Sequence, residues 1–80
     1  MPVVFKYKGY RFFFFSNEGE PPEPLHIHVR RAEATAKFWL FPLSLSESYG
    51  MNSSELGELM RVIEENKELI ERYWNEHFSI

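Results

Sequence analysis

Residues 25–41 read LHIHVRRAEATAKFWLF, and this stretch decides the fold because apolar and polar residues alternate along it twice. Side chains two residues apart on a strand point to the same face of a sheet. In residues 25–31, one face would hold Leu25, Ile27 and Val29, and the other His26, His28 and Arg30. In residues 34–41, one face would hold Ala34, Ala36, Phe38 and Leu40, and the other Thr35, Lys37, Trp39 and Phe41. Residues 32 and 33 suffice for a turn, so the two segments are predicted to be paired antiparallel strands.

The segments before this pair predict a second hairpin. Residues 3–7 (VVFKY) and 10–16 (YRFFFFS) are rich in aromatic and β-branched residues, and Lys8-Gly9 between them suits a tight turn. On the second strand, Tyr10, Phe12 and Phe14 would share one face, and Arg11, Phe13 and Phe15 the other. Phenylalanine on both faces predicts burial on both sides or an interface on one. Residues 17–24 (NEGEPPEP) are predicted to be a loop, because a glycine and three prolines do not suit regular structure.

The residues after the pair predict a long helix. Asn52 suits the N-cap, and Glu55 three residues later completes a variant of the capping box. Apolar residues then recur near the helical period, as Leu56, Leu59, Met60, Ile63, Ile70, Trp74 and Phe78. A helix from about residue 53 to 77 would be about 37 Å long, so it overhangs the sheet, bends near Asn66-Lys67 or packs on a second subunit. Residues 42–50 (PLSLSESYG) are expected to be a connector or short helix, although Leu-Ser-Leu-Ser also alternates as a strand does.

Together these segments predict one α+β domain over residues 1–80. Strands are expected within residues 1–41, a connector or short helix over 42–50, and a helix over 52–78. The fold would be a small antiparallel sheet of three to four strands, with the long C-terminal helix packed on one face. A chain of 80 residues buries only about 60% of the surface that its unfolded form exposes, so a partner subunit would add to a small stability.

Composition narrows the classes of function. The chain has no cysteine, which excludes thiolate chemistry and fits a reducing cytoplasm, where we expect the protein. No apolar run approaches the roughly 20 residues that span a bilayer, and no membrane partner is expected. The net charge of −3 argues against broad binding to phosphate. Residues 1–50 hold six basic residues against five glutamates, whereas residues 51–80 hold three against seven, which we interpret as a solvated helix face.

Four segments, in this order, are similar to a known family: GYRFFFFSNE, PEPLHIHVRR, AKFWLFPLSL and SSELGELMRVIEENKELIERYWNEHF. They resemble the small bacterial proteins of domain-of-unknown-function family 4160 over nearly the whole chain, and the His-x-His and Lys-Phe-Trp-Leu strands are the most specific parts. Family members commonly read Glu-Pro-Pro-His-x-His-Val and Phe-Trp-Leu-Asp-Pro. Here Leu25 replaces the second proline and Phe41 the aspartate, so this chain lacks any role of that aspartate. The resemblance implies a cytoplasmic bacterial protein, often encoded beside another small protein in pairs resembling toxin–antitoxin modules, and it implies no catalytic residue.

His26 and His28 are the first candidates for a site. Their Cβ atoms would lie about 7 Å apart on one side of the strand, and two imidazoles so spaced can converge on one metal ion. A third ligand is needed, but His77 is on the helix expected to cover the opposite face, and Glu23 is in the preceding loop. Strand histidines that are exposed or hydrogen-bonded, without a ligand, are the simpler interpretation, and no cofactor is predicted.

Neighbouring strands would add cations to this face. In the expected pairing, the face of His26, His28 and Arg30 meets that of Thr35, Lys37 and Trp39, and Arg11 can join from the preceding strand. Imidazole can move protons, Arg and Lys can neutralise a phosphate, and Trp39 can stack on a base. The candidate binding residues are Arg11, His26, His28, Arg30, Lys37 and Trp39, and the catalytic candidates are His26, His28 and Lys37. The simpler interpretation is that Trp39 fills the core while the cations only solvate the sheet.

We expect a non-catalytic protein that binds a partner protein, as one member of a toxin–antitoxin-like pair with the neighbouring gene product. A homodimer is a further option. The first alternative is an RNA-binding protein or metal-independent ribonuclease that uses His26, His28, Arg30 and Lys37, and the second is a metal-binding protein that uses His26 and His28. The site predictions depend on both imidazoles projecting away from the apolar interior, on the side that the helix leaves open.

Overall fold

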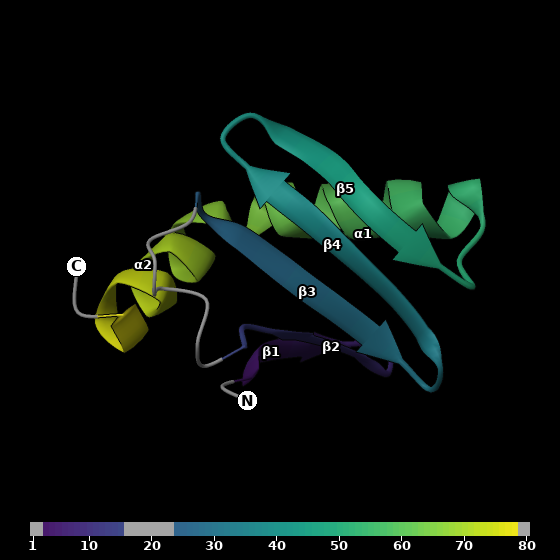
Figure 1. Ribbon diagram of the computed structural model, residues 1–80, viewed down its shortest axis with the longest axis horizontal. Helices are drawn as coiled ribbons and strands as arrows, with labels where there is room; N and C mark the ends of the chain where they lie inside the picture. Colours follow the sequence, from purple (N-terminus) through teal and green to yellow (C-terminus); the bar gives the residue numbers. More distant parts are fainter. Residues whose placement is uncertain (1–2, 16–23, 79–80) are drawn as a thin grey trace.

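The computed structural model describes residues 3–15 and 24–78, which form one antiparallel sheet and two helices. The strands are β1 (Val3–Tyr7), β2 (Tyr10–Phe13), β3 (His26–Arg31), β4 (Ala34–Leu40) and β5 (Leu43–Tyr49). Each strand pairs with the next in the chain, so the order across the sheet is β1-β2-β3-β4-β5 (Figure 1). The structure therefore confirms the α+β class, with five strands where three or four were expected.

The turns form where the sequence indicated. Lys8 and Gly9 both have positive φ angles, 47° and 85°, as a two-residue hairpin turn between twisted strands requires. Ala32, with φ 54°, takes the same left-handed conformation in the turn between β3 and β4. The β2 strand ends at Phe13, earlier than predicted, and the loop expected over residues 17–24 lies outside the described residues except for Pro24.

Residues 43–49 are the strand β5, so the expected connector or short helix is wrong. Pro42 lies in the turn between β4 and β5. Leu43 is opposite Leu40 and Leu45 is opposite Phe38, which places both leucines beside apolar neighbours on the core face. Cross-strand contacts of this kind stabilise a strand whose isolated sequence is ambiguous.

The C-terminal segment forms two helices, α1 (Ser53–Glu65) and α2 (Lys67–Phe78). The predicted capping box is present, because the Asn52 side chain accepts from the Glu55 amide at 2.7 Å and the Asn52 amide donates back to the Glu55 carboxylate at 3.3 Å. One helix was expected over residues 52–78, and a bend near Asn66-Lys67 was one of three alternatives for its length; the structure has a break at Asn66. The side-chain amide of Asn66 donates to the carbonyl of Val62 at 2.8 Å, which satisfies a carbonyl at the end of α1.

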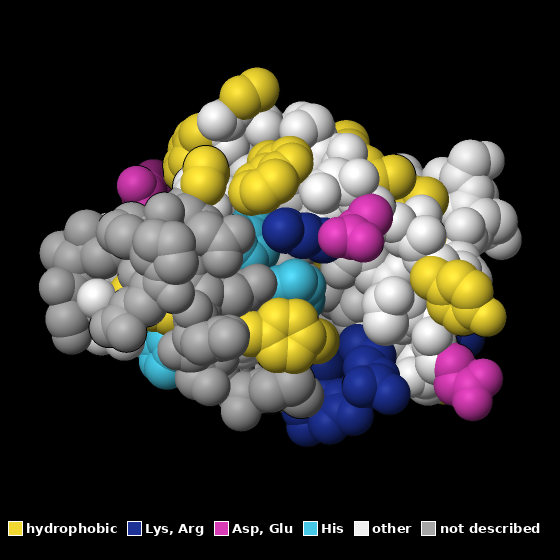
Figure 2. Space-filling view, viewed as in Figure 1, with side chains coloured by type: hydrophobic (Ala, Val, Ile, Leu, Met, Phe, Trp, Pro, Cys, Tyr) yellow, Lys and Arg dark blue, Asp and Glu magenta, His cyan; other side chains and the backbone are white. Residues whose placement is uncertain are grey.

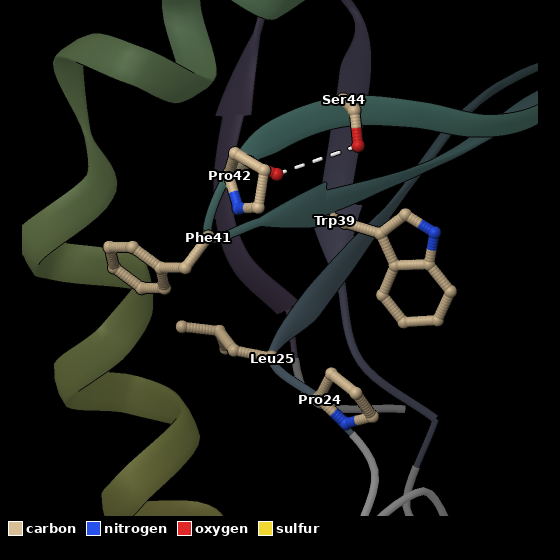
Figure 3. Close-up of a pocket in the computed structure, with 6 residues that line it drawn as sticks. All are labelled: Pro24, Leu25, Trp39, Phe41, Pro42 and Ser44. Carbon is tan, nitrogen blue, oxygen red and sulfur yellow. Dashed lines mark hydrogen bonds between the residues drawn. The ribbon is translucent and has the colours of Figure 1, made fainter.

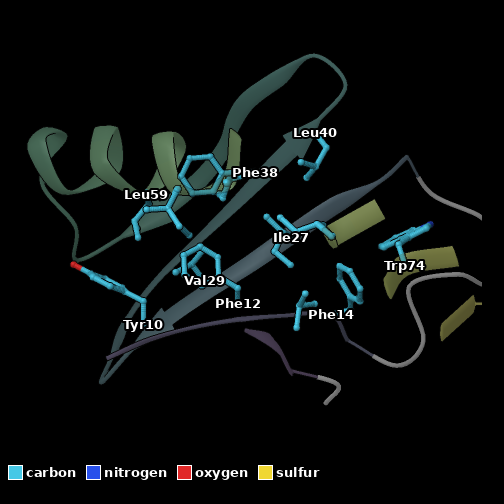
Figure 4. Packing of buried hydrophobic residues seen from close by; sticks show 14 residues of the cluster. Tyr10, Phe12, Phe14, Ile27, Val29, Phe38, Leu40, Leu59 and Trp74 are labelled. Carbon is cyan, nitrogen blue, oxygen red and sulfur yellow. The ribbon is translucent and has the colours of Figure 1, made fainter. Parts of the chain in front are cut away.

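The core lies between one face of the sheet and the helices. Phe12, Ile27, Val29 and Phe38 project from the central strands toward Leu59 and its neighbours on α1 (Figure 4). Figure 1 shows α1 behind the sheet and α2 beside the end at which β3 begins. We call the opposite side of the sheet, which α1 does not cover, the open face. Among the described residues, no helix is both long and apolar enough to cross a membrane.

Polar contacts join the β1–β2 hairpin to α1. The Tyr7 hydroxyl donates to the Glu58 carboxylate at 2.6 Å, and the Tyr10 hydroxyl donates to Glu55. Lys8 also contacts Glu58, with 3.3 Å between Nζ and Oε2. The hydrogen bond from Tyr7 lowers the pKa of Glu58, and that from Tyr10 lowers the pKa of Glu55. These two glutamates are half-buried docking groups, so the prediction of a solvated acidic helix face is wrong for them.

Candidate functional site: the open face and the β5 edge

The strand register gathers most of the candidate residues on the open face. His26, His28 and Arg30 of β3 lie opposite Trp39, Lys37 and Thr35 of β4, and Arg11 of β2 lies opposite Arg30. Directly opposed residues in an antiparallel pair share a face of the sheet. The structure thus has the cross-strand neighbours that alternation predicted, although the exposure of these residues differs widely.

A row of three cations crosses the open face. Lys6 is opposite Arg11, and Arg11 is opposite Arg30, so consecutive strands β1, β2 and β3 each contribute one cation. The row continues through Thr35 to Tyr49 on β5. Three of these five side chains are cationic, and all five are exposed to solvent. Figure 2 shows Lys and Arg side chains gathered on this face, next to histidine and hydrophobic side chains.

Among the described residues, no acidic side chain forms an ion pair with Lys6, Arg11 or Arg30. The ion pairs found there use other cations, namely Lys8 with Glu58, Arg61 with Glu65 and Lys67 with Glu64. The Arg30 side chain donates to the carbonyl of Ala32 at 3.1 Å. Like charges directly opposite one another destabilise a sheet. Binding of an anionic ligand would reduce the repulsion among these three cations.

The next row is of a different kind. His28 stacks on Phe13 with 5.6 Å between ring centroids, and Phe15 contacts its edge at 4.4 Å. Lys37 is opposite His28, half-buried, with its Nζ 4.5 Å from the centre of the Trp39 ring. Glu47 on β5 lies opposite Lys37. Lys37 and Trp39 therefore cover one another, which reduces what either offers to a ligand.

His26 is not on the solvent-exposed part of this face. Its side chain is fully buried, with 5.5 Å between the centres of its ring and that of Trp39, and 5.2 Å to that of Trp74. Its Nδ1 donates to the carbonyl of Pro24 at 2.9 Å. The expectation that both imidazoles face solvent is therefore wrong for His26. Because the helix breaks at Asn66, α2 brings Trp74 against His26 at the end of the sheet, on the side that the C-terminal helix was expected to leave open.

The geometry gives little support to a metal site. Among the described residues, no group of three or more His, Cys, Asp or Glu side chains is placed to hold an ion. His26 and His28 are near each other, with 5.1 Å between ring centroids. His77 is exposed on α2 with its ring against Phe78, and Glu23 lies outside the described residues. Metal binding through His26 and His28 therefore stays a prediction.

An apolar hollow lies at the β4–β5 turn. Its volume is about 350 Å³, and it is lined by Pro24, Leu25, Trp39, Phe41, Pro42 and Ser44 (Figure 3). Phe41, at the position where the family resemblance implied an aspartate, lies at the rim of this hollow and is 57% exposed. An exposed phenylalanine here makes this end of the sheet more apolar than an aspartate would.

The outer edge of β5 is a surface that was not predicted from the sequence. No other described strand pairs with that edge. Leu45, at 39% exposed, lies on the core face near the edge, and Leu43, Leu56 and Met60 are only half-buried there. We call the outer backbone of β5 and these four side chains the β5 edge. This surface could not be predicted from the sequence because residues 43–49 were not assigned to a strand.

Lys6 and Tyr49 are the open-face residues that were also missed. A two-residue turn at Lys8-Gly9 pairs Tyr7 with Tyr10 and therefore Lys6 with Arg11, so the sequence contained the signal for Lys6. Tyr49, which is 72% exposed, required β5 to be recognised.

The fold and these surfaces define a small α+β protein with an open sheet face and an unpaired edge strand. The family model described as domain of unknown function (DUF4160) matches residues 9–75, and the chain belongs to that family. No match was found among curated proteins. No solved structure matches the chain.

Proposed function

We propose that this protein acts by binding a partner protein, and that an extended strand of the partner pairs with the β5 edge. The observation that carries the proposal is a seven-residue edge strand flanked by exposed and half-buried apolar side chains. An edge strand presents a row of unpaired amides and carbonyls that can pair with another chain. Strand addition of this kind obtains affinity from backbone hydrogen bonds and specificity from side-chain pockets.

The two flanks of α1 differ, and the difference supports a partner-binding site at the β5 edge. Glu55 and Glu58 dock on tyrosines of the β1–β2 hairpin, so that flank is closed by hydrogen bonds. Successive helical residues are about 100° apart, which places Leu56 and Met60 on the other flank, toward β5. That flank has apolar side chains that remain partly exposed. A partner strand beside β5 would bury them together with Leu45.

The chemistry of β5 favours a different protein over a second copy. Glu47 is the one charged residue of the strand. Two copies of β5 paired antiparallel and centred on Glu47 would place the two Glu47 carboxylates directly opposite one another, which is unfavourable. The partner strand is therefore expected to have apolar residues on the helix side and a basic residue near Glu47.

The family resemblance indicates which partner protein should be tested first. If the gene lies in a toxin–antitoxin-like pair, the neighbouring gene product is the protein to test. We propose that this product supplies the strand, and that the complex, not a reaction catalysed by this chain, is the functional unit. Burial of His26 supports a non-catalytic role, because a fully buried base has no direct access to a substrate.

Two matched substitutions test the proposal. Leu45→Lys places a cation on the β5 edge, where lysine opposes strand addition, and Val3→Lys makes the same kind of change on the other edge strand. The two side chains are equally exposed in the fold, at 39% and 40%. We expect Leu45→Lys to weaken binding of the neighbouring gene product at least about tenfold, a loss of about 1.4 kcal/mol, and Val3→Lys to leave it unchanged. Binding is measured by titration calorimetry, with circular dichroism to confirm folding.

Three results would contradict the proposal. The first is no binding of the neighbouring gene product by the wild-type chain. The second is an equal effect of the two substitutions. The third is a stable wild-type homodimer in size-exclusion chromatography that Leu45→Lys converts to a monomer, because the β5 edge would then serve a second copy.

A further inference from the structure

We propose that the cation row Lys6–Arg11–Arg30, together with Tyr49, binds single-stranded nucleic acid across the open face. Tyr49 belongs to β5, but its side chain lies on the open face and is not among the four side chains of the β5 edge. The proposal does not depend on strand addition at that edge. It differs from the His26, His28 and Lys37 constellation that the sequence suggested. The ligand follows from the charge, spacing and aromatic content of one row of opposed residues.

The charge pattern selects a polyanion. Neighbouring strands lie about 4.8 Å apart, so the cations on β1 and β3 are roughly 10 Å apart with Arg11 between them. Among the described residues, no acidic side chain forms an ion pair with any of the three. Guanidinium groups bind phosphate through two parallel hydrogen bonds. Successive phosphates of a backbone that crosses the strands could therefore each meet one cation.

The remainder of the row favours nucleic acid over an acidic protein. Beyond Arg30 the row offers the hydroxyl of Thr35 and then the ring of Tyr49, 72% exposed. An acidic peptide has no need of an exposed aromatic ring, whereas an unpaired base stacks on one. Trp39 is less suited to this role than the sequence suggested, because Lys37 lies over its ring. Stacking on Tyr49 requires a base outside a duplex, so the ligand is single-stranded.

The binding test uses a fluorescently labelled oligouridine of about 12 nucleotides, within the usual size range of single-strand sites. Affinity is measured by fluorescence anisotropy at several salt concentrations. Three phosphate contacts predict a slope of log K against log salt of about −2. The double variant Arg11→Gln/Arg30→Gln should bind at least about tenfold more weakly, with a slope near −0.7. Tyr49→Ala should lose about fivefold or more without a change in slope.

The controls separate this site from general electrostatic attraction. Arg61→Gln removes one exposed positive charge from α1, on the other side of the sheet, and should leave affinity unchanged. Leu45→Lys alters the β5 edge and should not weaken this binding. Single-stranded DNA of the same length establishes whether the ligand is RNA, DNA or both, and each result agrees with the proposal if the Arg11, Arg30 and Tyr49 effects hold.

Four results would overturn it: no saturable binding at low salt, an Arg61→Gln loss as large as that of the double variant, a duplex that binds as tightly as the single strand, or polyglutamate that competes equally well. The last result would assign the row to an acidic protein. Arg11, Arg30 and Tyr49 are all exposed, so the variants are expected to fold, and matching circular dichroism spectra confirm it.

Discussion

The imidazole of His26 lies between the indole rings of Trp39 and Trp74, and its Nδ1 donates to the carbonyl of Pro24. The carbonyl can only accept, so Nδ1 carries a proton in this arrangement. The ring fills volume where β3 begins and where α2 meets the sheet. His26 therefore contributes to packing at the end of the sheet, while His28, half-buried between Phe13 and Phe15, contributes to the open face.

Replacement of His26 should destabilise the fold. We expect His26→Ala to lower the free energy of unfolding by about 3 kcal/mol, because it leaves a cavity beside two indole rings and removes a buried hydrogen bond. For a domain of this size, such a loss lowers the melting temperature by at least about 10 °C. His77→Ala, at an exposed position on α2, should change the free energy by less than about 0.5 kcal/mol. Thermal and urea unfolding measure both, and equal effects of the two variants would show that His26 is not a packing residue.

Alternation predicted which residues share a face, but it did not predict how accessible each one is. Arg11 and Arg30 are exposed, Lys37 is held over Trp39, and His26 is sealed, although all four lie on one face. Accessibility depends on what packs against the face from elsewhere in the chain. Trp74 reaches His26 only because the helix breaks, and a strand pattern contains no information about such a distant element.

The elements themselves were more predictable. Two-residue turns fixed the registers of the β1–β2 and β3–β4 hairpins, and the capping box fixed the start of α1. The length of the helix relative to a small sheet suggested a bend near Asn66 as one of three alternatives, and the structure shows a break there. β5 was missed because residues 42–50 are a short segment whose sequence does not distinguish a strand from a short helix or connector. Pairing with β4 and the apolar contacts of Leu43 and Leu45 decide its conformation, and these are tertiary effects.

The joint between the β1–β2 hairpin and α1 should make stability depend on pH. Hydrogen bonds from Tyr10 and Tyr7 lower the pKa of Glu55 and Glu58 from the ordinary value of 4.5. A group whose pKa is lower in the folded state stabilises the fold above its unfolded pKa and loses that contribution as pH falls through the folded pKa. The free energy of unfolding should therefore fall as pH decreases below about 4.5.

The double variant Tyr7→Phe/Tyr10→Phe isolates this joint, because it removes both donors and keeps the aromatic rings. We expect it to be less stable than the wild type at neutral pH and to lose less stability on acidification. Urea unfolding at a series of pH values measures both quantities. A pH dependence in the double variant identical to that of the wild type would show that other carboxylates cause the acid effect.

At the scale of the whole molecule, charge and apolar surface are separated. The open face has the cation row, the β5 edge has partly exposed leucine and methionine side chains, and the helices have most of the glutamates. The family match assigns the chain to a family of unknown function, so the functional proposals rest on the surfaces of this chain. A protein partner on the β5 edge and a nucleic acid on the open face would contact different side chains, so the two could bind together.

Hydrogen–deuterium exchange of the β5 amides tests the central claim most directly. In the isolated chain, the amides of residues 43–49 that point away from β4 should exchange rapidly, because no described strand pairs with them. On addition of the neighbouring gene product, the account predicts that these amides exchange at least about tenfold more slowly, as amides in newly formed backbone hydrogen bonds do, while those of β1 are unchanged. A complex that forms and leaves β5 exchange unaltered, with protection confined to β1 or the open face, would contradict it.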